Sequence, residues 1–458
     1  MGTARVAISL SRRTAARKLR AATTGTLRPD GTTLASMQTA DRLAVDGGTP
    51  VRQTFLDFSR GAGLLGDEER SAVLEVLESR SLFRYYGPHL LGRVSEFEAA
   101  LAEFTETEHA VATSSGTAAL RCALASLGVG CGDEVIVPAF TFIATVNAVV
   151  LAGAVPVFAE VDDTLGLDHV DVAAKLTSRT AAVVAVHLEN VACDLDPILA
   201  AITPAGVPLI EDAAQAMGVS YRGRQVGSVG ALGAFSFQLE KNVTAGEGGA
   251  LTTDDERLYL RAARYQDQGG QFVTSHMGER GGELDEPFAG ENLRMTEIAG
   301  AIVGVQLRKL PGLLDGLRTN RRRVASTIAQ VDGMTPRRIP DPDGQGGSSL
   351  TWFLPDPEVA RRFTKALLAE GVPCAQMYRG KPVYANPAIL HRRTASMKGG
   401  PWHCAEHPTA VEYHMGLCPR TEDLASRSLI VPIGPHWSPG DCEQVAGAVL
   451  KVASHLLG

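Results

Sequence analysis

The chain is poor in cysteine and contains no long apolar run. Seven of its 458 residues are cysteines, they are dispersed, and no two of them form a Cys-x-x-Cys pair. An odd, dispersed set is typical of reduced thiols in a cytoplasmic protein and argues against a disulfide framework. No stretch of about 18 apolar residues without a charge occurs, so the sequence predicts no membrane span.

The chain also lacks a surplus of positive charge. Its formal net charge is −7, which argues against the basic footprint of a nucleic-acid-binding protein. Basic residues dominate only the first 40 positions, which hold seven Lys or Arg and one acidic residue, Asp30. We expect residues 1–42 to form a disordered extension outside the fold, because Ser, Thr and Ala fill the gaps between these charges.

What the chain does contain is a regular alternation of strand-like and helical segments, which is typical of a mostly parallel sheet sandwiched by helices. We predict an α/β fold with a large domain at 43–318 and a smaller C-terminal α/β domain at 319–458. A helix at about 296–317 is expected to be interrupted near Pro311. The strands predicted for the large sheet are Glu134–Pro138, Val155–Val161, Ala181–His187, Pro208–Asp212 and Gly233–Phe237, and the C-terminal elements are Leu350–Leu354, Pro357–Glu370 and Pro439–Leu457.

A small, hydroxyl-rich turn opens the helix that begins near residue 117. The turn reads Thr-Ser-Ser-Gly-Thr-Ala-Ala-Leu from Thr113. Free backbone N–H groups and the helix dipole favour an anion at such a place, and Gly116 allows it to approach closely. Ser115 and Thr117 add hydroxyl donors. The alternative is a simple N-cap without a ligand.

Asp212 ends a predicted buried strand. A buried carboxylate is expected to have a cationic partner, because leaving it unpaired is costly. A protonated pyridine nitrogen would serve as that partner. The alternatives are a structural salt bridge and the cap of the next helix.

Lys241 follows a strand-like run and precedes a turn rich in glycine, residues 246–249. A lysine in a confined setting can lose its proton and form a Schiff base. The alternative is a solvated lysine beside a hairpin. Taken together, the turn at Gly116, Asp212 and Lys241 match the three contacts that pyridoxal 5'-phosphate (PLP) requires, namely phosphate, pyridinium and aldehyde.

Six segments resemble hallmarks of the DegT/DnrJ/StrS family of PLP-dependent sugar aminotransferases, which have the fold-type-I architecture. The resemblance runs from about Leu43 to the C-terminus. The segments are LAVDGGTPVR (43–52), SSGTAAL (114–120), GDEVIVPAFTFIAT (132–145), EDAAQAMG (211–218), FSFQLEKNVTAGEGGA (235–250) and ENLRMTEIAGAI (291–302).

The resemblance implies a role for each matching residue. Lys241 is similar to the Schiff-base lysine of the family, and Asp212 to the partner of the pyridine nitrogen. Gln215 stands where the family has a residue near the PLP 3-oxygen, and Phe142 matches an aromatic that stacks on the ring. The remaining positions are implied to bind the phosphate, the last two from a neighbouring subunit and hence in a homodimer with shared active sites: Gly116, Thr117, Ala118, Ser236, Asn292 and Arg294.

The resemblance also implies a ping-pong transamination in natural-product or glycan biosynthesis. An amino-acid donor, glutamate or glutamine, would supply the amino group, and a keto-sugar or keto-cyclitol would accept it. The amine of Lys241 would act as the general base. Two other functions remain open, a PLP-dependent dehydratase or aromatising lyase of the same family and a catalytically silent accessory subunit. Lys241 argues against the dehydratase, whose known examples have a histidine there, and the intact site argues against the accessory subunit.

Two segments depart from the family pattern. Glu189 places a carboxylate where neutral residues are usual, and Asn190 replaces a glycine but tolerates the left-handed conformation. The segment Tyr378–Cys418 is long and unusual, and we expect it to shape the acceptor pocket. His403, Cys404 and His407 in that segment fit no established zinc spacing, so no metal site is predicted.

Overall fold

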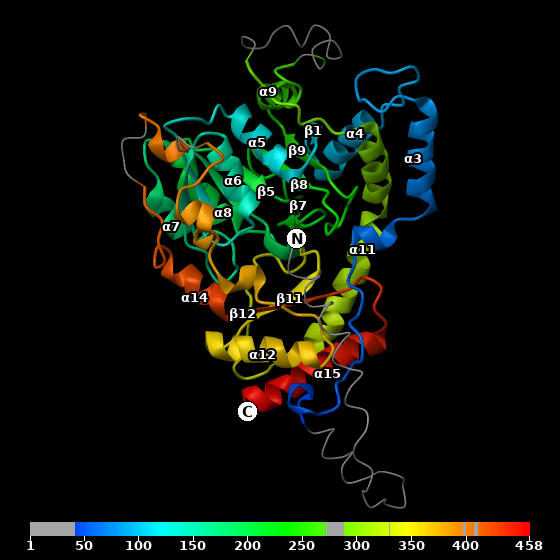
Figure 1. Cartoon of the computed structure of the whole chain (residues 1–458), viewed down its shortest axis with the longest axis vertical. Helices are drawn as coiled ribbons and strands as arrows, with labels where there is room; N and C mark the ends of the chain where they lie inside the picture. The colour runs from blue at the N-terminus through cyan, green and yellow to red at the C-terminus, as the bar shows by residue number, and fades with distance from the viewer. Residues whose placement is uncertain (1–41, 271, 273–287, 329, 397–399, 407–410) are drawn as a thin grey trace, which may run out of the picture.

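The computed structural model describes residues 42–270, 272, 288–328, 330–396, 400–406 and 411–458. All but the last residue of the predicted disordered extension therefore lies outside the described residues. The upper part of the molecule is built on a seven-stranded sheet with the order β1-β9-β8-β5-β4-β2-β3 (Figure 1). These strands are β1 (His109–Thr113), β2 (Glu134–Pro138), β3 (Val155–Ala159), β4 (Thr180–Val186), β5 (Leu209–Asp212), β8 (Leu232–Ser236) and β9 (Gly249–Thr253).

Five strands of this sheet, from β3 to β8, run parallel, and β9 runs antiparallel to both of its neighbours. Alternate residues of β4 point into different cores: Val183 and Ala185 pack on one face of the sheet, and Val184 packs on the other. Both faces are therefore covered, as the near-continuous apolar strands predict. The prediction of a mostly parallel sheet between helices is confirmed.

Two sets of helices cover the two faces. The core that contains Val184 also holds residues of α5 (Gly116–Ser126), α6 (Ile143–Leu151) and α9 (Glu256–Gln266). The core that contains Val183 holds residues of α4 (Arg93–Thr105), α7 (His169–Lys175), α8 (Leu195–Ile202) and α11 (Glu297–Thr327). A two-stranded hairpin, β6 (Ser220–Tyr221) and β7 (Arg224–Gln225), lies between β5 and β8 in the chain.

The C-terminal part forms a second, smaller α/β layer (Figure 1). Its three antiparallel strands are ordered β10-β11-β12 and comprise Thr335–Pro336, Ser349–Phe353 and Ser428–Pro432. They pack with α12 (Pro357–Ala369) and α15 (Pro439–Leu456), and α14 (Pro419–Arg427) precedes β12. Leu43 also lies in this core, so the N-terminal end of the described chain packs on the C-terminal part. The division at 318/319 stays a prediction.

The predicted interruption near Pro311 is wrong, because α11 is a continuous helix of 31 residues that includes Pro311. A proline inside a helix removes one hydrogen bond and costs about 3 kcal/mol. Here the helix packs against α3 (Asp67–Ser79), α4 and α15, and its Leu310, Leu313 and Leu314 are buried. Burying a leucine contributes roughly 1.5–3 kcal/mol, so packing on both parts of the molecule outweighs the proline.

The prediction that all seven cysteines are reduced is also wrong, because Cys131 and Cys404 form a disulfide with a Cα–Cα distance of 6.1 Å. The segment 378–418 folds back over the large sheet and brings Cys404 there. Trp402 donates to the hydroxyl of Tyr413 (3.0 Å), which donates to the carbonyl of Pro156 (2.7 Å). Among the described residues, five cysteines are free.

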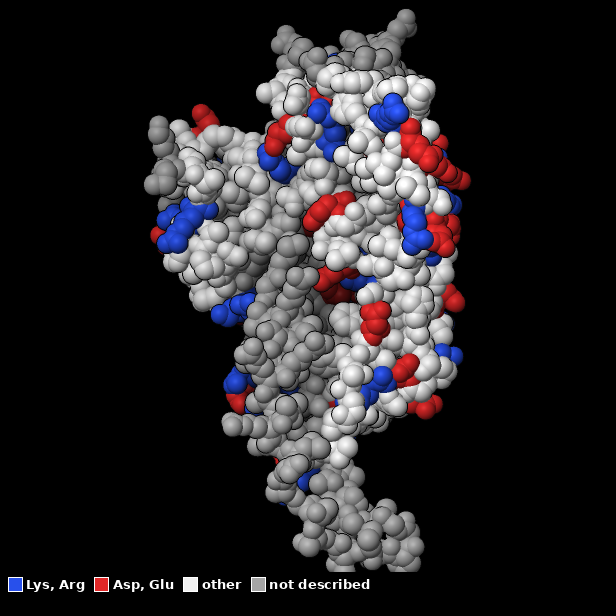
Figure 2. All heavy atoms as spheres, turned by 45° about the vertical axis from the view of Figure 1, so that its right-hand side comes forward, with Lys and Arg blue, Asp and Glu red and all other residues white. Residues whose placement is uncertain are grey.

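Charged side chains of both signs are interspersed on the side of the molecule that carries α3 (Figure 2). Arg93 pairs there with Glu75 (2.6 Å) and Lys309 with Glu69 (2.8 Å). No helix in the described part of the chain has the length and hydropathy needed to cross a membrane. The cytoplasmic location stays a prediction.

Candidate active site

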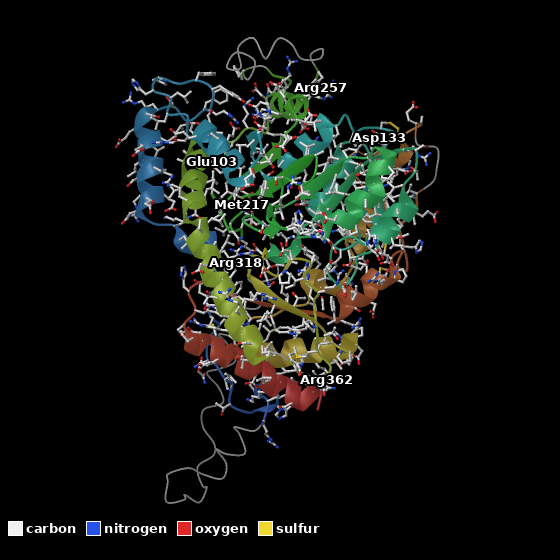
Figure 3. All side chains as sticks on the ribbon, turned by 180° about the vertical axis from the view of Figure 1, so that it is seen from behind. Glu103, Asp133, Met217, Arg257, Arg318 and Arg362 are labelled. Carbon is white, nitrogen blue, oxygen red and sulfur yellow. A yellow bond between two sulfur atoms is a disulfide. The ribbon has the colours of Figure 1, made fainter. Side chains whose placement is uncertain are left out.

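The predicted site residues meet at the carboxyl ends of the parallel strands, above the junction with the C-terminal part. Asp212 is the last residue of β5, and its register partner on β8 is Ala234, two residues before Ser236. Figure 3 labels two residues near this junction, Met217 in the large-sheet part and Arg318 on the long helix α11. Ligands of open α/β sheets bind at this edge, so the topology places these residues where a cofactor is expected.

The turn at the start of α5 leaves backbone donors free for an anion. Ser115 caps the helix, and its Oγ accepts from the N–H of Ala118 at 3.1 Å. The N–H groups of Gly116 and Thr117 come before the first intrahelical hydrogen bond. A Cβ on Gly116 would lie 2.7 Å from that of Ser236, so only glycine allows the turn to lie against β8. Ser115 therefore is an N-cap, and the remaining donors still suit a phosphate.

Asp212 is a buried carboxylate without a cation to pair with. Only 4% of its surface is exposed. It accepts hydrogen bonds from the Thr145 hydroxyl (2.8 Å) and the Ala214 N–H (3.2 Å), and no described residue forms an ion pair with it. Burial raises the pKa of Asp212, and the two hydrogen bonds and the charge of Lys241 only partly offset this. A pyridinium nitrogen would supply the missing cation.

Lys241 is half-buried, so the alternative of a fully solvated lysine does not describe it. Burial lowers the pKa of its amine, and the positive charge of Arg60 lowers it further, while Glu189 and Asp212 act in the opposite direction. Its backbone is fixed by hydrogen bonds to Gln238 (2.9 Å) and from Gly61 (3.1 Å). A lysine with a lowered pKa is more often neutral and therefore nucleophilic.

Gln215 connects this edge of the sheet to the C-terminal part. Its Nε2 donates to the Tyr378 hydroxyl at 3.0 Å, and its Oε1 accepts from the Glu189 N–H at 3.3 Å. Burial raises the pKa of Tyr378. Tyr378 was not predicted as a site residue, although the segment that begins with it was expected to shape the acceptor pocket. Thr145 was missed as well, and its place in a family-like segment was the only signal.

Phe142 has the exposure that a stacking residue needs. It precedes α6, and 55% of its surface is exposed. Its ring centroid lies 6.5 Å from that of Tyr378. An exposed aromatic ring offers a flat apolar face to a planar ligand.

Asn292 and Arg294 lie on the segment beside the turn of α5, where the Leu293 carbonyl accepts from the Ser114 N–H at 2.7 Å. Asn292 is exposed. Arg294 pairs with the buried Asp267 of its own chain at 2.7 Å. The predicted contact of these two residues with the phosphate of a neighbouring subunit stays a prediction.

Behind Asp212 lies a second buried carboxylate, Glu211, which is fully satisfied. It accepts from His187 Nε2 at 2.9 Å and from three backbone N–H groups, those of Gly227, Val229 and Gly230, at 2.7–2.9 Å. His187 Nδ1 accepts from the Cys193 N–H at 3.0 Å. The ring proton is therefore on Nε2, which donates the hydrogen bond to Glu211. This pair anchors the end of β5 and lies on the side of the strand opposite Asp212.

These residues fit PLP in the three places where the cofactor is recognised. The turn at Gly116 offers donors for the phosphate, Asp212 lacks the cation that the ring nitrogen would provide, and Lys241 supplies an amine of lowered pKa. No described group of His, Cys, Asp or Glu side chains could hold a metal ion. His407 lies outside the described residues, so the prediction about zinc is not tested.

Two curated relatives carry names that indicate carbohydrate or cyclitol chemistry. The chain is 34% identical over 421 residues to the spore coat polysaccharide biosynthesis protein SpsC of Bacillus subtilis, covering 88% of this chain and 98% of that protein. It is 40% identical over 320 residues to an L-glutamine:2-deoxy-scyllo-inosose aminotransferase of Micromonospora echinospora, covering 68% of this chain and 73% of that protein.

Solved structures of similar fold agree with these relatives. 3-Amino-5-hydroxybenzoic acid synthase superposes with a TM-score of 0.74 at 26% identity, over 89% of this chain and 100% of that one. The aminotransferase TlmJ of Streptoalloteichus hindustanus superposes with a TM-score of 0.72 at 30% identity, over 88% and 100%. The model of the DegT/DnrJ/EryC1/StrS aminotransferase family matches residues 64–450. With that match, the chain belongs to the DegT/DnrJ/EryC1/StrS family and is a PLP-dependent aminotransferase of the sugar and cyclitol type.

Proposed function

We propose that the protein transfers an amino group from glutamine or glutamate to a ketone on a polyhydroxylated ring, a keto-cyclitol or a keto-sugar. The observation that carries the proposal is that Lys241, whose pKa is lowered, and Asp212, whose buried carboxylate lacks an ion-pair partner among the described residues, lie at the same edge of the sheet, where α5 begins. The cyclitol aminotransferase to which the chain is 40% identical supports the choice of donor and acceptor.

The chain's own residues divide the chemistry between them. When bound, PLP supplies an aldehyde and a ring that withdraws electrons from the substrate carbon. The amine of Lys241 holds the cofactor and, once released, moves a proton between substrate and cofactor, a task for which a lowered pKa is suited. Asp212 keeps the ring nitrogen protonated. The turn at Gly116 and Ser236 orient the phosphate, and Phe142 and Gln215 orient the ring.

A homodimer with shared active sites is part of this proposal. Several apolar side chains of the segment before α4 are exposed, and such surfaces are often covered by a partner. They include Phe55 (54%), Leu74 (50%), Leu77 (48%) and Tyr86 (61%). If Asn292 serves the neighbouring site, mixing inactive Lys241→Ala and Asn292→Ala chains will restore part of the activity in mixed dimers. Separate sites within each chain would leave the mixture inactive.

The proposed function is tested by following the two half-reactions separately. The protein loaded with PLP is expected to show the visible absorption of the lysine-bound cofactor, to convert it to the amine form with glutamine or glutamate, and to recover the first spectrum when a keto-cyclitol is added. Mass spectrometry of the product would show the replacement of the ketone by an amine. A protein that binds PLP but responds to neither donor would contradict the proposal and support the accessory role.

A further inference from the structure

Glu189 and Asn190 form a turn that the surrounding structure holds in an unusual conformation. Both residues are left-handed, with φ angles of 53° and 58°, which costs roughly 1–2 kcal/mol for each residue other than glycine. Gln215 accepts from both N–H groups, with its side chain at 3.3 Å and its carbonyl at 2.9 Å. Asn190 donates to Ser348 (2.8 Å) and accepts from Asn242 (2.5 Å). Such over-determined strain is typical of functional sites.

The carboxylate that this turn presents has no partner among the described residues. Glu189 is partly buried, yet neither a hydrogen bond to its side-chain oxygens nor an ion pair is found in the described part of the chain. Its negative charge is nonetheless close enough to Lys241 and Tyr378 to favour their protonated forms. Glu189 therefore lies beside the reacting groups and is left available for a ligand.

Arg337 is the obvious candidate for a structural counter-ion, but its two described hydrogen bonds go to backbone carbonyls. It is buried, and it donates to the Thr164 carbonyl at 2.6 Å and to the Leu188 carbonyl at 3.0 Å. Burial lowers the pKa of Arg337 to about 10. Arg337 thus holds the backbone next to Glu189 in place, and although the charge of Glu189 acts to raise the pKa of Arg337, no hydrogen bond or ion pair joins the two side chains in the described part of the chain.

The ligand that suits this carboxylate is the acceptor rather than the donor. Glutamine and glutamate bring a carboxylate of their own, which Glu189 repels. A polyhydroxylated ring brings hydroxyl donors, and the two oxygens of an ionised carboxylate accept hydrogen bonds from neighbouring hydroxyls. We propose that Glu189 selects the acceptor by binding two adjacent hydroxyl groups of the ring that carries the ketone. This inference rests on the proposed function and adds the residue that recognises the hydroxyl groups of the acceptor ring.

The test compares Glu189→Gln and Glu189→Met, with Glu240→Gln as the matched control. Glu240 is an exposed carboxylate whose charge also acts on Lys241. The donor half-reaction with glutamine should stay within about twofold of the parent rate in all three variants. With 2-deoxy-scyllo-inosose, kcat/KM should fall about tenfold in Glu189→Gln, which keeps one acceptor oxygen, and about a hundredfold in Glu189→Met, since a hydrogen bond to a charged group is worth about 10- to 100-fold. Glu240→Gln should be unchanged.

A second readout uses an analogue of the same ketone that lacks one further ring hydroxyl. A site built to bind a hydroxyl strongly rejects an analogue without it, so the parent enzyme should discriminate and Glu189→Met should lose most of that discrimination. The affinity for PLP, measured by titration, should not change.

Three results would overturn the inference. An equal loss in both half-reactions would make Glu189 a residue of the common machinery, and an unchanged acceptor reaction would leave it without a role. Equal losses in the Gln and Met variants would show that Glu189 acts through its charge, as in binding an ammonium group, and not by accepting hydrogen bonds from hydroxyl groups. If the parent protein fails already with glutamine and glutamate, the proposed function fails instead, and this is visible before any acceptor is added.

Discussion

The two faces of β5 carry neighbouring carboxylates with opposite properties. Glu211 points to the side that we call the closed face, because the carboxylate there is fully hydrogen-bonded. Burial alone would raise the pKa of Glu211, but the hydrogen bonds from His187 and the backbone lower it overall. Asp212 points to the opposite side, where burial raises its pKa and two hydrogen bonds do not compensate. We call this side of the strand end the open face, because the carboxylate there lacks an ion-pair partner among the described residues. Adjacent residues of a strand face opposite sides of the sheet, so one strand end carries a carboxylate that the chain satisfies fully and one that it leaves without an ion-pair partner among the described residues.

The difference lies in how fully each carboxylate is satisfied. Glu211 accepts four hydrogen bonds from His187, Gly227, Val229 and Gly230, and its surroundings leave no room for a ligand. Asp212 accepts two hydrogen bonds, and no described residue forms an ion pair with its carboxylate. A buried polar group that the protein leaves incompletely satisfied is a better indicator of a binding site than burial alone.

The largest effect is expected on the open face, from Lys241→Ala. Removing the amine takes away both the covalent attachment of PLP and the general base, so turnover should fall by about 10⁴-fold or more. The visible absorption of the lysine-bound cofactor should disappear, and borohydride should no longer fix PLP to the chain. Attachment at another lysine would show that the open face is not the active site.

Asp212→Asn should come next in size. The amide cannot hold the ring nitrogen in its protonated form, so kcat should fall by about 10²- to 10³-fold, the range seen when a single electrostatic contact to the transition state is removed. Glu211→Gln provides the contrast, because once folded it should turn over within about tenfold of the parent enzyme. Equal losses in the two variants would erase the distinction between the faces.

The closed face should instead dominate stability. In Glu211→Gln one acceptor oxygen becomes an NH₂ group that meets backbone N–H donors, and we expect a loss of about 3 kcal/mol in the free energy of unfolding, since each buried unsatisfied group costs about 1–3 kcal/mol. Urea denaturation of the protein without PLP measures this. A loss below about 1 kcal/mol would mean that the Glu211 anchor is dispensable.

The pH dependence of stability should have opposite signs on the two faces. The pKa of Asp212 is raised in the folded state. The contribution of its carboxyl group to stability is therefore most favourable below the unfolded pKa of 3.8, where the group is neutral, and becomes less favourable as the pH rises through the folded pKa. Without PLP, Asp212→Asn should therefore be more stable than the parent at pH 7, by on the order of 1 kcal/mol, and this gain should vanish near pH 4.

Glu211 should show the reverse. Its pKa is lowered in the folded state, so its contribution is complete above the unfolded value of 4.5 and is lost as the pH falls through the folded value. The deficit of Glu211→Gln should stay constant between about pH 5 and pH 8 and shrink in acid. Parallel pH profiles for the two variants would contradict the assignment of opposite shifts.

The sequence was sufficient for the parts of the fold and site that are encoded locally. The β-branched runs predicted β2, β3, β4, β5 and β8 to within two residues at each end, because strands buried on both faces are nearly continuous in apolar residues. β1 (His109–Thr113) and β12 (Ser428–Pro432) were not predicted, and the alanines of β1, which have a low preference for strands, explain its omission. Lys241 and Asp212 were predicted as site residues because each stands next to a strand end, where ligands of such sheets bind, and their roles stay a prediction.

Contacts between distant segments could not be predicted. Tyr378 meets Gln215 across 163 positions, and Cys131 meets Cys404 across 273. Neither pair has a local pattern, because both arise where the segment 378–418 returns to the large sheet. The continuity of α11 through Pro311 has the same origin, since the packing that outweighs the proline comes from α3, α4 and α15.

The smallest predicted effect tests how far the support of Asp212 extends. The hydroxyl of Thr145 lies between Asp212 (2.8 Å) and the hydroxyl of Thr141 (2.9 Å). Thr145→Val removes one of the two hydrogen bonds to the carboxylate, so the pKa of Asp212 should rise further and kcat should fall by at most about tenfold. Thr141→Val removes only the outer hydroxyl and should have a smaller effect. If both variants changed kcat equally, the pair would act through packing of α6, and the hydrogen bond from Thr145 would not be what holds the carboxylate on the open face.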